Sequence, residues 1–220
     1  MSDALNDSAE FSRLLTSTLG KELAPDQIDR IIAFREEVLR ENVLQNLTRL
    51  TSPRDFLEGN VLDVIHLEKS GLLELPALDL GAGMGVPGIL HAVIYRPKGA
   101  KTWISSDSEG KKADFSRRMI EKFDLAGAQA TSKRGEEVLD SQEIGTIVSR
   151  AVGSVTKLYG WLRTRSTWNT MILLKGPKWD EEWAEFQSTA AGKRLVVDKI
   201  YEYTAGEAQK RLKIVRLKRK

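Results

Sequence analysis

One segment constrains the fold of this chain more than any other: the glycine-rich run Asp-Leu-Gly-Ala-Gly-Met-Gly-Val-Pro-Gly at residues 79–88. An apolar run, Ala77–Leu80, precedes its first glycine, and an apolar helical pattern, Val86–Tyr95, follows the turn. Glycines at such a junction allow a tight turn and a close approach of a ligand to the backbone. The start of the helix adds free N–H groups and a partial positive charge. The segment therefore predicts a ligand site where a strand passes into a helix.

The glycine spacing fits two classes of cofactor. Gly83, Gly85 and Gly88 match the GxGxxG pattern of dinucleotide-binding proteins. Asp79, together with Gly81, Gly83 and Gly85, instead matches the D-x-G-x-G-x-G turn of S-adenosylmethionine-dependent methyltransferases. Asp79 favours the second class, because its carboxylate suits the methionine end of that cofactor and would be repelled by a pyrophosphate.

A second acidic residue is expected at the end of the next strand, where it would hold ribose hydroxyls. Asp107 directly follows the apolar run Thr102–Ser106 and lies 22 residues after Gly85. Both cofactor classes use an acid there, so Asp107 supports a nucleoside ligand without choosing between them. A glycine turn that binds nothing is the weaker alternative.

From Pro76 onward, short apolar runs alternate with helical patterns, which is typical of an α/β fold with helices on both faces of a mostly parallel sheet. A ligand is then expected outside the carboxyl ends of the strands. The expected strands are 77–80, 102–106, 145–149, 170–174, 194–203 and 211–217, and the expected helices are 86–95, 111–123 and 180–188.

The residues before Pro76 carry helical patterns only. Asp7 and Glu10 have the spacing of a capping box, and Gly20 ends the apolar stripe that follows. Pro25 opens a second, longer helix, and Ser52 has the position of an N-cap for a third. We therefore expect a helical cap that packs on the α/β body.

Charge divides the chain in the same way. Residues 1–75 hold 8 Lys and Arg against 14 Asp and Glu, whereas residues 76–220 hold 26 against 17. A basic body attracts polyanions, and nucleic acid is the first candidate. A solvated basic surface on an ordinary enzyme is the alternative.

Composition and missing motifs exclude several functions. The chain has no cysteine, which rules out disulfides, thiolate metal sites and cysteine nucleophiles, and its two histidines are too few for a typical zinc site, so we expect no metal. No GxxxxGK[ST] phosphate loop and no GxSxG nucleophile motif occurs. No apolar run approaches the roughly 20 residues of a membrane span, and the N-terminus has no signal-peptide pattern, which favours the cytoplasm.

With these residues in view, the chain resembles the small-subunit ribosomal RNA guanine-N7 methyltransferases, also called the glucose-inhibited division protein B family. The resemblance extends from about Ile28 to the C-terminus. The glycine turn is common to all methyltransferases, whereas its Pro87-Gly88 ending is more specific, as are the Ser-Arg-Ala and Leu-Lys-Gly segments. The matching segments are 46–48, 62–63, 79–88, 107–112, 134–137, 148–151 and 174–176.

This resemblance implies a Rossmann-like, class I S-adenosylmethionine-dependent methyltransferase. The fold would be a seven-stranded, mostly parallel sheet with an N-terminal helical cap over residues 1–75 and the methyltransferase domain over residues 76–220. The implied cofactor is S-adenosyl-L-methionine, and the implied partner is small-subunit (16S) ribosomal RNA or a small ribosomal subunit particle, with no membrane. We expect a monomer.

The resemblance also assigns site residues. Arg134, Arg150 and Lys175 would form a basic cluster that binds the substrate, and Arg150 would also reach the cofactor; surface charge is the alternative for Arg134 and Lys175. A solvated helix start is the alternative for Glu136, which with Gly135 would flank the adenine. The expected cofactor-binding residues are Asp79, Gly81, Gly83, Gly85, Val86, Asp107, Gly135, Glu136 and Arg150.

The chain departs from the family pattern chiefly in the cap. Gln45 stands where the family often has an aromatic residue, Asn60 where it often has a histidine, and Met84 where it usually has a proline. These departures affect the expected docking of RNA more than the cofactor site.

The expected reaction is a direct displacement in which guanine N7 attacks the methyl carbon of the sulfonium. Guanine N7 has a free lone pair at neutral pH, so no general base is needed, and alignment of the reactants carries the catalysis. A donor from Arg or Lys on guanine O6 would select guanine over adenine. Four tryptophans of the C-terminal half offer either a stacking face for unpaired bases or ordinary packing: Trp161, Trp168, Trp179 and Trp183.

Three other functions remain open at this point. A methyltransferase for a small molecule or a protein would have the same cofactor half. A nicotinamide-dependent oxidoreductase would use the GxGxxG pattern. A non-catalytic RNA-binding module would keep the fold without the reaction.

Overall fold

The computed structural model describes residues 2–206 and 208–220 of the chain. Its centre is a seven-stranded sheet with the strand order β3-β2-β1-β4-β5-β7-β6. Strands β1 to β5 run parallel, and β7 is antiparallel to both of its neighbours. The strands are β1 (Ala77–Leu80), β2 (Trp103–Ser106), β3 (Gln129–Thr131), β4 (Thr146–Arg150), β5 (Thr170–Lys175), β6 (Leu195–Ala205) and β7 (Lys210–Arg219). The expected α/β fold with a mostly parallel sheet is therefore confirmed.

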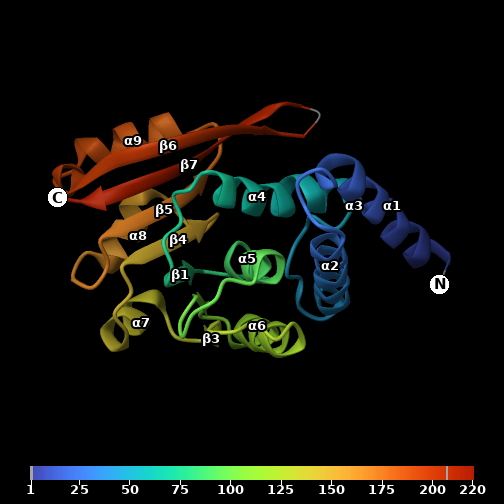
Figure 1. The fold of residues 1–220 in the computed structure, drawn as a ribbon. Coiled ribbons are helices and arrows are strands. Elements are labelled where there is room, and N and C mark those ends of the chain that lie inside the picture. The colour runs from blue at the N-terminus through green and yellow to red at the C-terminus, as the bar shows by residue number, and fades with distance from the viewer. Residues whose placement is uncertain (1, 207) are drawn as a thin grey trace.

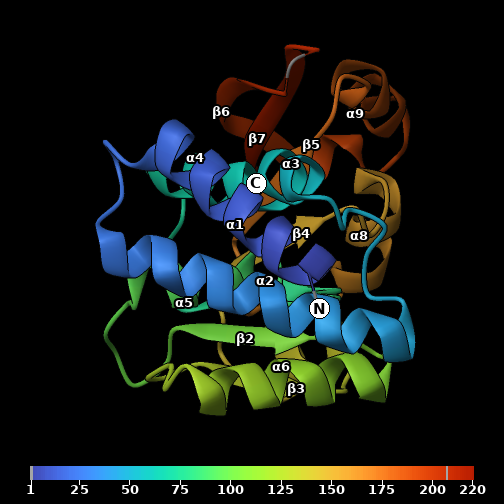
Figure 2. The same cartoon turned by 90° about the vertical axis from the view of Figure 1, so that its right-hand side faces the viewer.

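Helices cover the sheet from two sides, with α1 and α2 far from α7 and α8 (Figures 1 and 2). The N-terminal elements are α1 (Ser2–Leu19), α2 (Pro25–Gln45), α3 (Pro53–Phe56), the π-helix η1 (Leu57–Val61) and α4 (Leu62–Lys69). The later elements are α5 (Gly88–Tyr95), α6 (Gly110–Lys122), α7 (Gly135–Ser141), α8 (Val155–Leu162), α9 (Trp179–Ser188) and the 3-10 helix η2 (Gly192–Arg194). Among the residues that the structure describes, no helix is both long and apolar enough to cross a membrane.

One hydrophobic cluster joins the N-terminal helices to the sheet. It runs from Phe11 and Phe34 of the helical region to Val148 of β4 and Ile214 of β7. A second cluster, which contains Trp168 and Trp179, fills the space between the sheet and α7 to α9. Residues from the acidic and the basic part of the chain therefore share one core.

The structure confirms two of the three helix starts that were expected before Pro76. Helix α2 begins at Pro25, and the Ser52 side chain accepts a hydrogen bond from the Asp55 backbone N–H at 3.1 Å as the N-cap of α3. The prediction that a capping box at Asp7 starts a helix is wrong, because α1 already begins at Ser2. Asp7 lies inside that helix, and its carboxylate accepts two hydrogen bonds from the buried Arg35 guanidinium at 2.6 and 3.1 Å.

Strand β3, the helices α7 and α8 and the 3-10 helix η2 were not expected from the pattern. Strand β3 has only three residues, and it lies at the edge of the sheet with no buried side chain. Helices α7 and α8 have 7 and 8 residues, which is about two turns each. Segments this short leave too few apolar positions to show a period.

Candidate cofactor and substrate site

The glycine loop between β1 and α5 depends on backbone conformations that glycine permits. Gly81, Gly83 and Gly85 have φ values of 71°, 56° and 86°, in the left-handed region that costs other residues about 1–2 kcal/mol. The backbone N–H groups of Gly81 and Ala82 donate to the Ser106 carbonyl at 2.8 and 3.0 Å, which ties the loop to the end of β2. A Cβ atom on Gly81 would lie 2.5 Å from the Val152 side chain.

A cavity opens where β1 and β2 end and α7 begins, and we call it the cofactor cavity. Its volume is about 230 Å³, a little below the roughly 300–1,000 Å³ typical of small-molecule sites. Five residues expected at the cofactor or the substrate line it: Gly81, Asp107, Arg134, Gly135 and Glu136. It also includes Leu80, Ser106, Ser108, Val152 and Trp161.

The Asp107 carboxylate is held in place by two backbone N–H groups. Its Oδ2 accepts from Gly83 at 2.9 Å, and its Oδ1 accepts from Glu109 at 2.9 Å. A carboxylate oxygen has room for more than one hydrogen bond, so both oxygens can still accept from a diol. The geometry suits an acceptor for ribose hydroxyls.

Asp79 lies behind the glycine loop and is only 1% exposed. Its Oδ2 accepts from the Gly88 backbone N–H at 2.8 Å, and its Oδ1 has no hydrogen-bond partner. Burial raises the pKa of this carboxyl to about 7, against the opposing effects of the Gly88 hydrogen bond and of the Arg150 charge. Asp79 thus positions the start of α5 from below, and a role toward the methionine end of a cofactor stays a prediction.

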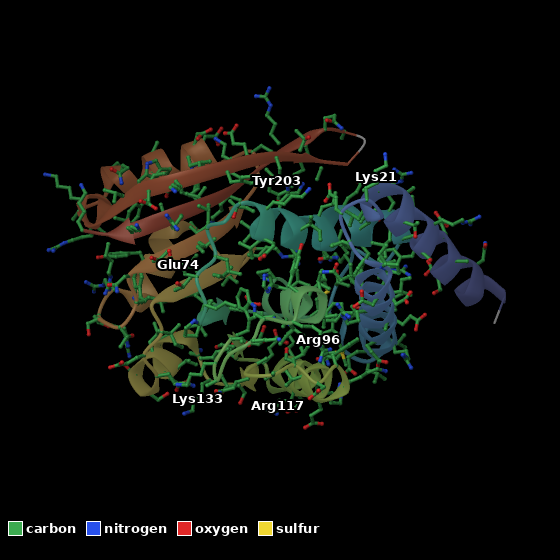
Figure 3. All side chains as sticks on the ribbon, viewed as in Figure 1. Lys21, Glu74, Arg96, Arg117, Lys133 and Tyr203 are labelled. Atoms are coloured by element: carbon green, nitrogen blue, oxygen red, sulfur yellow. The ribbon has the colours of Figure 1, made fainter. Side chains whose placement is uncertain are left out.

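Arg150, at the end of β4, turns toward the N-terminal helices. Its guanidinium donates to Asp63 Oδ2 at 3.0 Å, to Asn60 Oδ1 at 2.9 Å and to the Gly59 carbonyl. The other oxygen of Asp63 accepts from the Tyr203 hydroxyl at 2.6 Å. Burial and the neighbouring Asp63 carboxylate raise the pKa of Tyr203. We call these five residues the Arg150 network; Tyr203 belongs to β6, on the side toward α4 (Figure 3).

The three basic residues expected at the substrate lie in different surroundings. Arg134 lines the cofactor cavity. Lys175 Nζ instead donates to the Gly153 carbonyl at 2.9 Å and to Glu182 Oε1 at 2.8 Å. Arg150 is engaged by the network described above. Only Arg134 therefore faces the cavity directly.

Trp161, one of the four tryptophans named as possible stacking residues, lines the cofactor cavity. It is 37% exposed, and the Lys157 ammonium lies 5.0 Å from the centroid of its ring. Trp168 and Trp179 are buried in the core, so packing was the right alternative for those two. Nothing in the local sequence separates Trp161 from the others, because the difference depends on which way α8 faces.

Both histidines have partners in the fold. His66 Nδ1 lies 3.1 Å from the Tyr201 hydroxyl, and His91 Nε2 lies 3.0 Å from Glu68 Oε2. Burial lowers the pKa of His66. In the part of the chain that the structure describes, no group of three or more His, Cys, Asp or Glu residues is arranged to hold a metal ion.

Comparison with solved structures supports the fold. The O-methyltransferase from Bacillus cereus in complex with SAH is similar, with a TM-score of 0.57 and 16% identity over 94% of this chain and 96% of that one. M. capricolum TrmK, in complex with S-adenosyl-homocysteine, has a TM-score of 0.52 and 15% identity over 70% of this chain and 67% of that one. The fold is that of class I S-adenosylmethionine-dependent methyltransferases.

Sequence comparison identifies the family. The Ribosomal RNA small subunit methyltransferase G of Rhodopirellula baltica is 31% identical over 90% of this chain and 84% of its own length. The protein of the same name from Thermotoga sp. is 28% identical over 86% of this chain and 82% of its own length. The family model described as rRNA small subunit methyltransferase G matches residues 27–212. The chain therefore belongs to the rRNA small subunit methyltransferase G family.

Proposed function

We propose that this protein transfers a methyl group from S-adenosyl-L-methionine to N7 of a guanine in small-subunit (16S) ribosomal RNA. The observation that carries the proposal is the meeting of Gly81, Asp107, Gly135 and Glu136 around one cavity in a chain of this family. The proposal includes a cytoplasmic enzyme that acts as a monomer, either on naked RNA or on a small ribosomal subunit particle.

The residues around the cavity fit the cofactor. Asp107 offers acceptors to the ribose hydroxyls, and Gly135 and Glu136 begin α7, which would lie beside the adenine. Gly135 has the closest fit, since a Cβ atom there would lie 2.3 Å from the Leu80 side chain that lines the cavity. When bound, the cofactor supplies a methyl group activated by its sulfonium centre.

The chain itself would act mainly by binding and orientation. Arg134, which lines the cavity, would direct its cation at O6 of the guanine while N7 stays free. No general base is required of the protein. Alignment of reactants in such a site accounts for up to about 7–11 kcal/mol of barrier lowering.

The test is methyl transfer from labelled S-adenosylmethionine into small-subunit ribosomal RNA, followed by nucleoside analysis. A 7-methylguanosine product that is lost in Gly83→Ala is the expected result. That substitution meets no atom within 4 Å, but it places a side chain at φ 56° at the bend of the loop. Label in a different nucleoside, or label only in a small acceptor, would contradict the proposal. Light scattering of the purified protein tests the monomer.

A further inference from the structure

A second cavity lies at the opposite edge of the sheet, where β5 and β6 begin and β7 ends, and we call it the amino-edge cavity. Its lining contains four arginines and a lysine: Arg163, Arg165, Arg194, Arg219 and Lys220. The hydroxyl-bearing Thr164 and Ser166 line it as well. Residues from three separate segments therefore bring positive charge to one hollow.

Most of this charge is not neutralised. Arg163 and Arg194 are exposed, and within residues 2–206 and 208–220 no acidic side chain forms an ion pair with either of them. Asp140 neutralises Arg165 through two hydrogen bonds at 2.9 and 2.8 Å. Arg163, Arg194 and Arg219 then remain as a positive excess.

The loop that carries Arg163 and Arg165 is held in place by Arg219. The Arg219 guanidinium donates to the carbonyls of Arg163 and Arg165 at 2.8 and 2.6 Å and lies 4.0 Å from the centroid of the Trp168 ring. These carbonyls follow the end of α8, where backbone acceptors lack helical partners. The loop is thus ordered before any ligand arrives, which lowers the entropic cost of binding.

The amino-edge cavity is close to the cofactor cavity along the chain. Trp161 lines the cofactor cavity, and Arg163, two residues later, lines the amino-edge cavity. Both cavities are therefore lined by residues at the end of α8 or directly after it.

We propose that the amino-edge cavity binds backbone phosphates of the ribosomal RNA substrate, outside the segment that carries the guanine. The inference rests on the proposed function. Arginine suits this ligand because its planar guanidinium donates two parallel hydrogen bonds to phosphate oxygens. Such contacts fix the register of the RNA on the protein without reading its bases.

The experiment measures binding of small-subunit ribosomal RNA as a function of salt concentration. The test variant is Arg163→Gln with Arg194→Gln, and the matched control is Lys98→Gln with Lys101→Gln. Those lysines are exposed near the start of β2, three strands away from β5. Both variants lose two positive charges. The thermal shift with S-adenosylhomocysteine is recorded for each, and it reports on the fold and the cofactor cavity.

For the test variant we expect the slope of log K against log salt to fall by about 2 units, roughly 1 for each lost phosphate contact. Binding at low salt should weaken about tenfold or more. The control should keep the wild-type slope, and both variants should keep the thermal shift. Arg163→Lys with Arg194→Lys should retain most of the slope, since the charges remain.

Four results would overturn the inference. One is equal slopes for the test and control variants. Another is a slope lost as fully with lysine as with glutamine, which would mean a structural effect. The third is that inorganic phosphate, at constant ionic strength, displaces RNA from the wild type but not from the variants. That result would mean a site for free anions. Poly-glutamate binding that equals RNA binding would likewise reject a phosphate ligand. If RNA binds with the expected slopes but receives no methyl group, the proposed function fails and this inference stands.

Discussion

The cofactor cavity and the Arg150 network lie at the same edge of the sheet and are built in opposite ways. The cavity is formed by glycines, by the start of a helix and by Asp107, whose oxygens can still accept hydrogen bonds. In the network, Asp63 uses both oxygens and Arg150 makes three contacts, all within the protein. The cavity keeps polar groups available for a ligand. In the network, the polar groups bond to one another and join the N-terminal helices to the sheet. Changes in the cavity should therefore alter binding, and changes in the network should alter stability.

Arg150→Ala should have the largest effect. Removing one partner of a largely buried ion pair costs about 3–5 kcal/mol, because Asp63 keeps its charge without a cation. Urea denaturation should show this loss, and methyl transfer should fall as well. Arg150→Lys, which keeps the charge, should lie in between. A variant as stable as the wild type would remove the distinction between the two regions.

Asp79→Asn should change the pH dependence of stability. With a pKa raised from 3.8 to about 7, folded Asp79 keeps a proton that the unfolded chain loses. The free energy of unfolding of the wild type therefore decreases as pH rises from about 4 to 7, by at most about 4 kcal/mol. The variant lacks this titration and should gain relative stability at pH 8. Urea titrations at pH 4, 6 and 8 measure the difference, and parallel pH profiles would contradict it.

Gly135→Ala should weaken S-adenosylhomocysteine binding by roughly tenfold, which corresponds to about 1.4 kcal/mol. The new Cβ atom would lie 2.3 Å from the end of the Leu80 side chain, which must then move. Gly160→Ala, in α8, meets no atom within 4 Å and serves as the control. Calorimetric titration compares the two. If Gly135→Ala and Gly160→Ala bind S-adenosylhomocysteine equally well, the added methyl group at the start of α7 does not hinder the ligand.

Ser52→Ala should have the smallest effect and act on stability alone. It removes the acceptor for the Asp55 N–H at the start of α3, which is worth about 1 kcal/mol. The affinity for S-adenosylhomocysteine should stay unchanged, because α3 does not line the cavity. Thermal melts with and without the ligand check both halves of this expectation. A change in affinity would mean that the two regions are coupled.

The glycine loop and the parallel sheet were predictable because the patterns behind them are local in sequence. Gly81, Gly83 and Gly85 are needed for a turn with positive φ, and Asp107 follows its strand directly. Apolar runs separated by helical patterns also suffice to indicate a parallel sheet. The Asp7 capping box failed because an acid in this spacing is equally suited to an ion pair, here with Arg35.

The sequence by itself determined the fold class, the position of the glycine loop and the acidic residue that follows β2. Only the tertiary structure decided that Arg150 pairs with Asp63, that Trp161 faces the cavity while Trp168 is buried, and that Arg163 and Arg194 share a hollow. The physical reason is the range of the interactions. Backbone conformation and hydrophobic period act over a few residues, whereas ion pairs and cavities join side chains that only the packing of distant elements brings together.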